Sequence, residues 1–255
     1  MKAAIHRLLN RAGIELRLVR NLKAAHLAAK RDQELDAWRV LAHHGFATVL
    51  DIGANEGQFA AMARRLWPQA AVHSFEPIPD VYAALAARFA EDSKVVTHCI
   101  GLSDQPGVQV IHRSAFSPSS SLLPMAELHR KEWPQTAEHT DIEIRLERLD
   151  DWASGQKVGG VLRKPMLIKI DVQGFELAVL GGGATTLRAA DFAVLEVSFV
   201  ELYEKQPLFA DIHARMGELG FAYCGNVEQF TSKDKSRVLF ADAIFENANP
   251  AIRND

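Results

Sequence analysis

The chain has few cysteines and no long apolar segment. Only two cysteines, Cys99 and Cys224, occur in 255 residues, which is too few for the disulfide framework of a small secreted protein. Both lie in apolar runs typical of strands, so we expect buried thiols. No apolar run approaches the roughly 18 residues of a membrane-spanning helix, and the basic N-terminus lacks the apolar stretch of a secretory signal. These absences indicate a cytoplasmic protein.

Several catalytic signatures are missing as well. Neither G-x-x-x-x-G-K-[ST] nor G-x-S-x-G occurs, so a P-loop nucleotide hydrolase and an α/β-hydrolase have no support. The ten histidines show no spacing typical of metal ligands, and we assign no residue to a metal. His112, His129 and His139 fall in an irregular region, where they are candidates to line a substrate site or ordinary surface or core histidines.

Basic charge is concentrated at the N-terminus. Residues 1–31 carry eight Lys or Arg and one acid, which leaves 21 basic and 31 acidic residues for the rest of the chain. An acidic main body argues against nucleic acid as a partner. Residues 1–45 have the apolar periodicity of helices. We expect a helical extension that packs on the domain or on a homodimer partner; the alternative is peripheral contact of residues 1–31 with an anionic membrane surface.

From Phe46 onward, strand and helix patterns alternate in a single domain over residues 46–250. Strands are expected at Thr48–Ile52, Val72–Phe75, Val95–Ile100, Met166–Ile170 and Phe192–Ser198. Helices are expected at Gln58–Leu66, Pro79–Ala90, Phe175–Arg188 and Phe209–Leu219. Short Val- and Ile-rich strands separated by helices predict a parallel, doubly wound α/β sheet. Phe221–Gly225 and Val238–Phe245 leave no room for a helix between them, so they predict an antiparallel C-terminal hairpin.

Residues 105–165 interrupt the alternation. Val108–His112 and Ile142–Leu146 have strand patterns that we expect to pair outside the main sheet, and the polar, turn-rich segment 114–121 lies between them. Long irregular segments in compact domains are often lids. We interpret this insertion as the cover of the substrate site; the alternative is a surface loop.

A glycine-spaced turn follows the first strand and leads into a helix. Gly53 and Gly57 would let a ligand lie against backbone at a helix N-terminus. Asp51 and Glu56 flank the turn and would repel a pyrophosphate, whereas they suit a cation. Glu76 follows the second strand, where a carboxylate can accept both hydroxyls of a ribose. The pattern favours S-adenosylmethionine over NAD; the remaining alternative is a turn without a ligand.

Acidic residues recur at or near the ends of the predicted strands. Asp171 and Glu196 join Asp51 and Glu76 in this position. Carboxyl ends of parallel strands meet at one edge, and ligands bind there near the point where the strand order reverses. Four acids in one crevice need a partner such as a sulfonium, an ammonium, a metal or substrate hydroxyls.

The residues resemble the FkbM-type S-adenosylmethionine-dependent methyltransferases over roughly residues 46–245. The resemblance rests on Asp51-Ile52-Gly53-Ala54-Asn55-Glu56-Gly57, Phe75-Glu76-Pro77, Leu102-Ser103-Asp104 and Ile168-Lys169-Ile170-Asp171-Val172-Gln173-Gly174-Phe175-Glu176. It implies a class I, Rossmann-like fold and methyl transfer, usually to a hydroxyl of a sugar, a lipid-linked glycan or a polyketide. Family members often carry Glu where Gln173 stands here, and the basic N-terminal segment lies outside the resemblance.

Cofactor roles follow for a set of residues. Asp51 or Glu56 would meet the ammonium group, Glu76 would accept the ribose hydroxyls, and Asp104 would border the adenine; for Asp104 the alternative is a plain turn residue. The full cofactor-binding set is Asp51, Gly53, Asn55, Gly57, Phe59, Glu76, Pro77, Ser103, Asp104 and Asp171.

Removing the proton of an alcohol acceptor calls for a base. Asp171 is the first candidate, followed by Glu196 and Glu176, although an acid in the first turn of a helix, such as Glu176, is stabilised there without any catalytic role. A divalent metal on these carboxylates is the alternative means of activating the acceptor. The predicted function is O-methylation of a hydroxyl on a sugar, glycoconjugate or similar small molecule. The alternatives are an NAD-linked oxidoreductase and a non-catalytic membrane- or partner-binding protein with the same fold.

Overall fold

The computed structural model describes residues 35–155 and 162–249. The chain divides into two compact units, Met1–Val40 and Leu41–Asp255. Residues 1–34 of the helical extension expected over residues 1–45 lie outside the described residues. The packing or membrane contact of that extension stays a prediction. In the described part of the chain, no helix combines the length and apolar character needed to cross a membrane.

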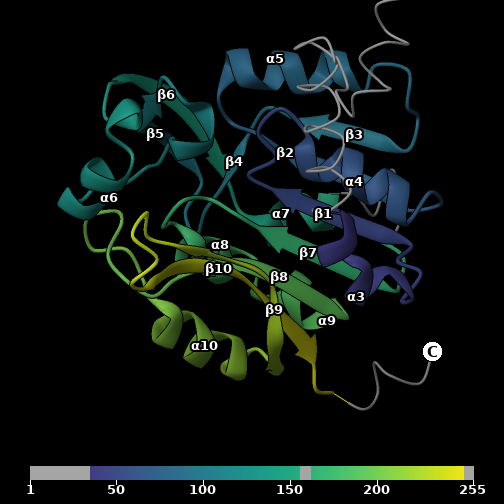
Figure 1. Cartoon of the computed structure of the whole chain (residues 1–255). Helices are drawn as coiled ribbons and strands as arrows, with labels where there is room; N and C mark the ends of the chain where they lie inside the picture. The colour runs from purple at the N-terminus through teal and green to yellow at the C-terminus, as the bar shows by residue number, and fades with distance from the viewer. Residues whose placement is uncertain (1–34, 156–161, 250–255) are drawn as a thin grey trace, which may run out of the picture. The chain divides into compact units, whose positions relative to one another are not determined.

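The main sheet has seven strands in the order β3-β2-β1-β7-β8-β10-β9 (Figure 1). The strands are β1 (Thr48–Ile52), β2 (Ala71–Phe75), β3 (Val95–His98), β7 (Met166–Ile170), β8 (Phe192–Ser198), β9 (Phe221–Thr231) and β10 (Val238–Asn247). The first five of these pair in parallel, whereas β10 runs antiparallel to β8 and β9. The predicted class I methyltransferase layout, a doubly wound sheet with an antiparallel C-terminal hairpin, is confirmed.

The crossovers between strands of the main sheet carry α4 (Gln58–Leu66), α5 (Pro79–Arg88), α7 (Leu149–Gly155), α8 (Glu176–Gly182), α9 (Ala184–Ala189) and α10 (Phe209–Glu218). In addition, α3 (Arg39–Ala42) precedes β1, and α6 (Glu127–Glu132) lies in the insertion. The main core joins apolar side chains from α7, α8, α9 and α10 to one face of the sheet. All five residues of both central strands, β1 and β7, are buried, as strands covered on both faces must be.

A second sheet of three strands, in the order β4-β6-β5, lies apart from the main one (Figure 1). Its strands are β4 (Gly101–Leu102), β5 (Gly107–Ser114) and β6 (His139–Glu147). Strands β5 and β6 are antiparallel, so the two strand patterns predicted in the insertion do pair outside the main alternation. Ile111 and Ile144 of this sheet pack with Val81 of α5. The insertion thereby gains a small core of its own.

One sequence-based expectation is refined by the structure and one is wrong. The helix expected over Phe175–Arg188, whose pattern the glycine run 181–183 interrupts, is two helices, α8 and α9, separated at Gly183. At Gly182 a Cβ would lie 1.9 Å from the carbonyl oxygen of Ser103, so the glycines admit a neighbouring backbone. Both thiols are exposed rather than buried. Cys99 follows the end of β3, and Cys224 lies on the edge strand β9, where apolar neighbours in the sequence do not imply cover on both faces.

Candidate functional site

The strand order reverses between β1 and β7, and the turn after β1 is fixed there by backbone contacts. The amides of Gly53 and Ala54 both donate to the Phe75 carbonyl at the end of β2. The Asp171 amide after β7 donates to Ile52. Three strand ends are therefore joined at the point where open α/β sheets bind ligands.

Gly53 is required by this close approach, which gives a prediction. It has φ 82°, and an added Cβ would lie 1.8 Å from the carbonyl oxygen of Asp171. Gly45 has a similar φ of 62° but open space around it, so Gly45→Ala serves as the control for backbone strain alone. We expect Gly53→Ala to lose about 1–3 kcal/mol more stability than Gly45→Ala, because the turn carrying Asp171 must shift. Urea unfolding measures this; equal losses would contradict it.

Five charged side chains share one face of the sheet at this edge. Asp51 and Lys169 are paired across β1 and β7, and Glu196 and Asp242 are paired across β8 and β10. Because side chains alternate along a strand, Asp171 lies on the same face as Lys169, two residues before it. The group is called the acid cluster below and comprises Asp51, Asp171, Glu196, Asp242 and Lys169.

Lys169 is the cation of the acid cluster. Its Nζ lies 2.9 Å from Asp171 Oδ2 and 5.5 Å from the centre of the Phe59 ring, and the residue is only 8% exposed. Burial alone would lower the pKa of Lys169, but the charges of Asp171, Asp51 and Asp242 raise it. The lysine is therefore held charged, one cation among four carboxyl groups.

Three carboxyl groups of the cluster, those of Asp51, Asp242 and Glu196, resist ionisation because they are buried. Burial raises the pKa of Asp51 to about 6, against the opposing charge of Lys169. Burial likewise raises the pKa of Asp242 to about 6. The pKa of Glu196 is raised well above its usual value by burial and then by the charges of Asp171 and Asp242. A bound cation would relieve this repulsion.

Gln173 connects the acid cluster to the insertion. Its Nε2 donates to Asp171 Oδ1 at 2.8 Å and to Glu196 Oε1 at 3.0 Å. Its Oε1 accepts a hydrogen bond from the Tyr203 hydroxyl at 2.9 Å, and its backbone carbonyl accepts one from Ser121 Oγ at 2.7 Å. An amide can donate to two carboxylates and still accept from a phenol, which a carboxylate at this position cannot do.

Glu76 lies at the end of β2 with both oxygens held by backbone. Oε2 accepts from the Asn55 amide and Oε1 from the Ile78 amide, each at 2.9 Å. Burial raises the pKa of Glu76 to about 7, although these two amides oppose the shift. Each oxygen keeps a lone pair for a further donor, so the side chain is fixed and can still accept a pair of hydroxyls.

The Glu176 side chain is buried and accepts hydrogen bonds from the backbone of the preceding turn. It is 3% exposed, and its Oε1 accepts from the amides of Val172 and Gly174 at 3.2 and 3.1 Å. The side chain thus closes the turn between β7 and α8. This contact agrees with the non-catalytic interpretation weighed for an acid at the start of a helix.

Not all predicted site residues meet at the strand ends. Ser103 and Asp104 pack against α8 at the end remote from Asp171: a Cβ on Gly182 would meet Ser103, and one on Gly181 would meet Asp104. Glu56 is exposed, and its amide is capped by Asn55 Oδ1. Gly57 has φ 80° and faces the side chains of Phe89 and Leu85.

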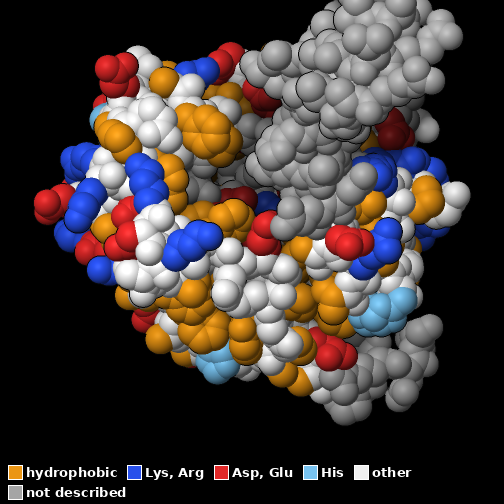
Figure 2. All heavy atoms as spheres, in the orientation of Figure 1, with side chains coloured by type: hydrophobic (Ala, Val, Ile, Leu, Met, Phe, Trp, Pro, Cys, Tyr) orange, Lys and Arg blue, Asp and Glu red, His pale blue; other side chains and the backbone are white. Residues whose placement is uncertain are grey.

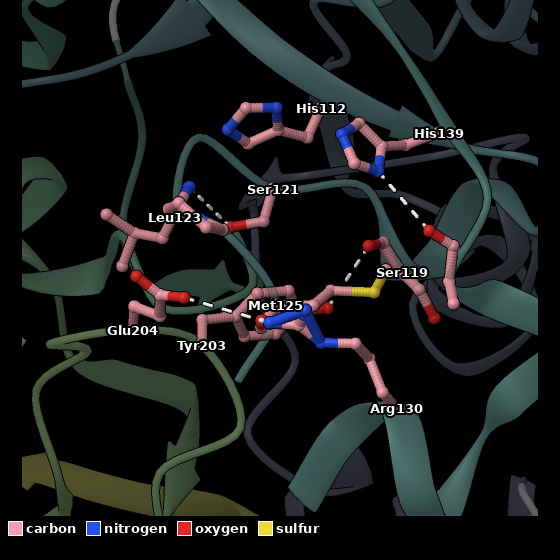
Figure 3. A pocket seen from close by; sticks show the side chains of 11 residues that line it. His112, Ser119, Ser121, Leu123, Met125, Arg130, His139, Tyr203 and Glu204 are labelled. Carbon is pink, nitrogen blue, oxygen red and sulfur yellow. Dashed lines mark hydrogen bonds and ion pairs between the residues drawn. The ribbon is translucent and has the colours of Figure 1, made fainter. Parts of the chain in front are cut away.

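The insertion touches the turn after β1 and forms most of the wall of a cavity. Ser117 Oγ and the Asn55 side-chain amide are within hydrogen-bonding distance, at 3.1–3.2 Å. The cavity measures about 180 Å³ and its lining is shown in Figure 3. Its wall consists of His112, Ser119, Ser121, Leu123, Pro124, Met125, Arg130, Ala137, His139, Tyr203 and Glu204. Of the three histidines considered from the sequence, His112 and His139 line it, whereas His129 is buried against Trp133 and Tyr203.

Figure 2 shows a hollow near the centre of the visible face, with acidic and basic side chains at its floor.

Three residues of the candidate site were not predicted from the sequence: Lys169, Asp242 and Tyr203. Lys169 could have been found, because it precedes Asp171 by two residues in a strand and so shares its face. Asp242 could also have been noticed, because it is an acidic residue within an apolar strand. Tyr203 carries no local signal, since only the tertiary fold brings it to Gln173.

The donor set fits S-adenosylmethionine, which the family resemblance implies. Asp51 Oδ1 is buried and has no hydrogen-bond partner among residues 35–155 and 162–249. A buried carboxylate oxygen without a donor is costly, and the ammonium of the cofactor or a water between them would satisfy it. Glu76 offers two oriented lone pairs for ribose hydroxyls. The excess of carboxylates over cations suits a sulfonium and an ammonium, and disfavours a diphosphate.

Comparisons with known proteins agree with these features. The family model "Methyltransferase FkbM domain" matches residues 51–223. The chain is 31% identical over 169 residues to 2-O-methyltransferase NoeI of Sinorhizobium fredii; the match covers 62% of this chain and 66% of that one, just under two thirds. It is 28% identical over 242 residues to 31-O-demethyl-FK506 methyltransferase FkbM of Streptomyces tacrolimicus, covering 81% and 88%.

Solved structures are more distant in sequence. A putative RNA methyltransferase from Pyrococcus horikoshii is 11% identical, with TM-score 0.47 and coverage of 86% of this chain and 84% of that one. Magnesium protoporphyrin IX methyltransferase from Synechocystis is 10% identical, with TM-score 0.45 and coverage of 97% and 100%.

Proposed function

The chain belongs to the FkbM methyltransferase family, and we propose that it methylates a hydroxyl oxygen on a sugar, glycoconjugate or similar small molecule. The chain is a methyltransferase that uses S-adenosylmethionine. The observation that carries the finer proposal is the raised-pKa carboxyl group of Glu196, joined through Gln173 to Tyr203 in the cavity wall. Two relatives named for O-methylation support the choice of oxygen.

When bound, S-adenosylmethionine supplies a methyl group activated by its sulfonium. Glu76 would hold the ribose, and Asp51 would hold the ammonium directly or through water. Asp171 would border the methionine part, because it follows β7 beside the turn at Gly53. Alignment of the two reactants is the main contribution required of the protein, and oriented reactants can gain about 7–11 kcal/mol.

Glu196 is a better base than Asp171, the first candidate from sequence. Both oxygens of Asp171 are engaged, one by Lys169 and the other by Gln173. Glu196 accepts one bond from Gln173, and its raised pKa makes it a stronger proton acceptor near neutral pH. In this proposal Glu196 takes the proton of the acceptor hydroxyl, while Asp171 and Lys169 hold Gln173 and the cluster in place.

The body of the acceptor is proposed to bind in the cavity under the insertion, with the reacting hydroxyl reaching past Tyr203 to Glu196, which does not itself line the cavity. Tyr203 forms part of its wall and is one hydrogen bond from Gln173, which is one hydrogen bond from Glu196. His112, His139, Arg130 and Glu204 give the cavity polar groups for hydroxyls, while Leu123 and Met125 offer an apolar surface. A panel of hydroxyl-bearing sugars, glycoconjugates and polyketides, assayed with methyl-labelled cofactor, tests this. An N-methyl product would overturn the choice of oxygen.

The family assignment removes the NAD-linked oxidoreductase considered from sequence. A non-catalytic protein with this fold is distinguished by calorimetry with S-adenosylmethionine and with its demethylated product. We expect heat from both titrations; no heat from either, in folded protein, would contradict the cofactor site.

Glu76→Ala tests the ribose contact. Losing a charge-assisted pair of hydrogen bonds should weaken cofactor binding by about 1.5–3 kcal/mol. Because Glu76 also accepts from the Asn55 and Ile78 amides, Glu76→Gln is the matched variant that keeps the shape and one acceptor oxygen. Calorimetry should rank affinities wild type, then Glu76→Gln, then Glu76→Ala. Unchanged affinity in both variants would refute the ribose role.

A further inference from the structure

Three side chains of types that bind metals meet on one face of the small sheet. His112 on β5 is paired with Asp141 on β6. His139 precedes Asp141 by two residues in the same strand and therefore points to the same side. The antiparallel register brings His112 beside the other two residues, which no spacing along the chain indicates.

The donor atoms converge on one point. Asp141 Oδ1 lies 2.7 Å from His112 Nδ1 and 3.7 Å from His139 Nε2. One donor atom from each residue can be chosen so that all three lie within 4.8 Å of one another. Ligands about 2.0–2.1 Å from a tetrahedral ion are about 3.3 Å apart, so small side-chain rotations complete the geometry. No other group of three His, Cys, Asp or Glu side chains in residues 35–155 and 162–249 is placed this way.

A cavity adjoins this cluster. His112 and His139 both line the cavity of about 180 Å³, and Figure 3 shows the two rings side by side at its edge. Two imidazoles and one carboxylate leave coordination positions open. An oxygen-bearing molecule in the cavity could therefore reach an ion held there. Open coordination positions of this kind are typical of catalytic metal sites, whereas structural sites are closed.

We propose that His112, His139 and Asp141 bind one divalent transition-metal ion in the cavity wall. Imidazole nitrogens select zinc, cobalt, nickel or copper over magnesium and calcium, which prefer all-oxygen sites. The inference does not depend on methyl transfer or on the identity of the acceptor. It differs from the sequence-based expectation, in which no residue was assigned to a metal.

The test is titration of the full chain, without a histidine tag, with Co²⁺ followed by its visible ligand-field absorption, and with Zn²⁺ followed by calorimetry. We expect one ion per chain. His112→Ala, His139→Ala and Asp141→Asn should each bind at least about tenfold more weakly. The control is His213→Ala, since His213 is an exposed histidine on α10, and its affinity should equal that of wild type.

Thermal unfolding of each variant in EDTA shows whether the fold survives the substitution. Asp141→Asn is the mildest variant, because it keeps the size of the side chain and one ligand oxygen. The proposal is overturned if neither titration detects binding, which would leave the cluster as an ion pair only. It is equally overturned if stoichiometric binding persists unchanged in all three cluster variants, which would place the ion elsewhere.

Discussion

Replacing Glu196 by glutamine should lower the rate of methyl transfer about 10²–10⁴-fold, the usual range for loss of a general base. Glutamine keeps the shape of the side chain and an oxygen that can accept from Gln173 Nε2. It also removes one charge from a crowded set of carboxyl groups, so the fold should be no less stable. The rate is measured with whichever hydroxyl acceptor the panel identifies, and cofactor affinity is measured separately by calorimetry.

The pH profile distinguishes a base from a group that only positions others. Burial and the charges of Asp171 and Asp242 raise the pKa of Glu196, so in wild type the rate should fall as pH drops through that raised value and the base becomes protonated. Glu196→Gln should lose this limb of the profile. Glu176→Gln is the matched control, because Glu176 caps the amides of Val172 and Gly174; its profile should keep the wild-type form. A full rate in Glu196→Gln would transfer the role to another group.

The main strands could be predicted because their pattern is local. Thr48–Ile52, Met166–Ile170 and Phe192–Ser198 have the predicted bounds, since apolar runs between turn residues leave little choice. The division of α8 from α9 falls at the run Gly181-Gly182-Gly183, which interrupts the helix pattern in the sequence. The close approach of the Ser103 backbone to Gly182 could not be predicted, because the two segments meet only in the folded chain. Burial of Cys99 was predicted wrongly because composition alone does not say where a strand ends.

Some residues of the candidate site could be predicted from the sequence and others could not. The strand-end acids were found because a parallel sheet brings its carboxyl ends to one edge. The roles within the cluster could not be ranked from sequence, because they depend on contacts between strands. Both oxygens of Asp171 accept hydrogen bonds, one from Lys169 and one from Gln173. Glu196 accepts from Gln173 through its Oε1. Tyr203 and the cluster at His112 come from segments joined only by tertiary packing.

Lys169→Met should cost about 3–5 kcal/mol of unfolding free energy at pH 8, the range for removing one partner from a buried ion pair. Methionine fills a similar volume, so the loss is electrostatic. Lys169 is the cation that opposes the burial shift at both Asp51 and Asp242. Without it, Asp51, Asp171, Glu196 and Asp242 would repel one another with no compensating charge.

The sign of the pH dependence follows from these raised pKa values. A carboxyl group whose pKa is higher in the folded state favours folding while it is protonated, and this contribution is lost as pH rises through the folded value. The pKa values of Asp51 and Asp242 are already about 6, and loss of Lys169 raises them further. At pH 5.5 Asp51 and Asp242 of the variant are largely protonated, so the loss of stability should be much smaller than at pH 8.

Urea unfolding of Lys169→Met at both pH values measures this difference. Lys131→Met is the control, because Lys131 is an exposed lysine on α6, and surface substitutions change stability by about 0.5 kcal/mol or less. Saturating S-adenosylmethionine should stabilise the variant at pH 8, since the cofactor brings positive charge to the same carboxylates. An equal loss at pH 8 and pH 5.5 would mean that Lys169 acts through packing alone, and the electrostatic account of the acid cluster would then be wrong.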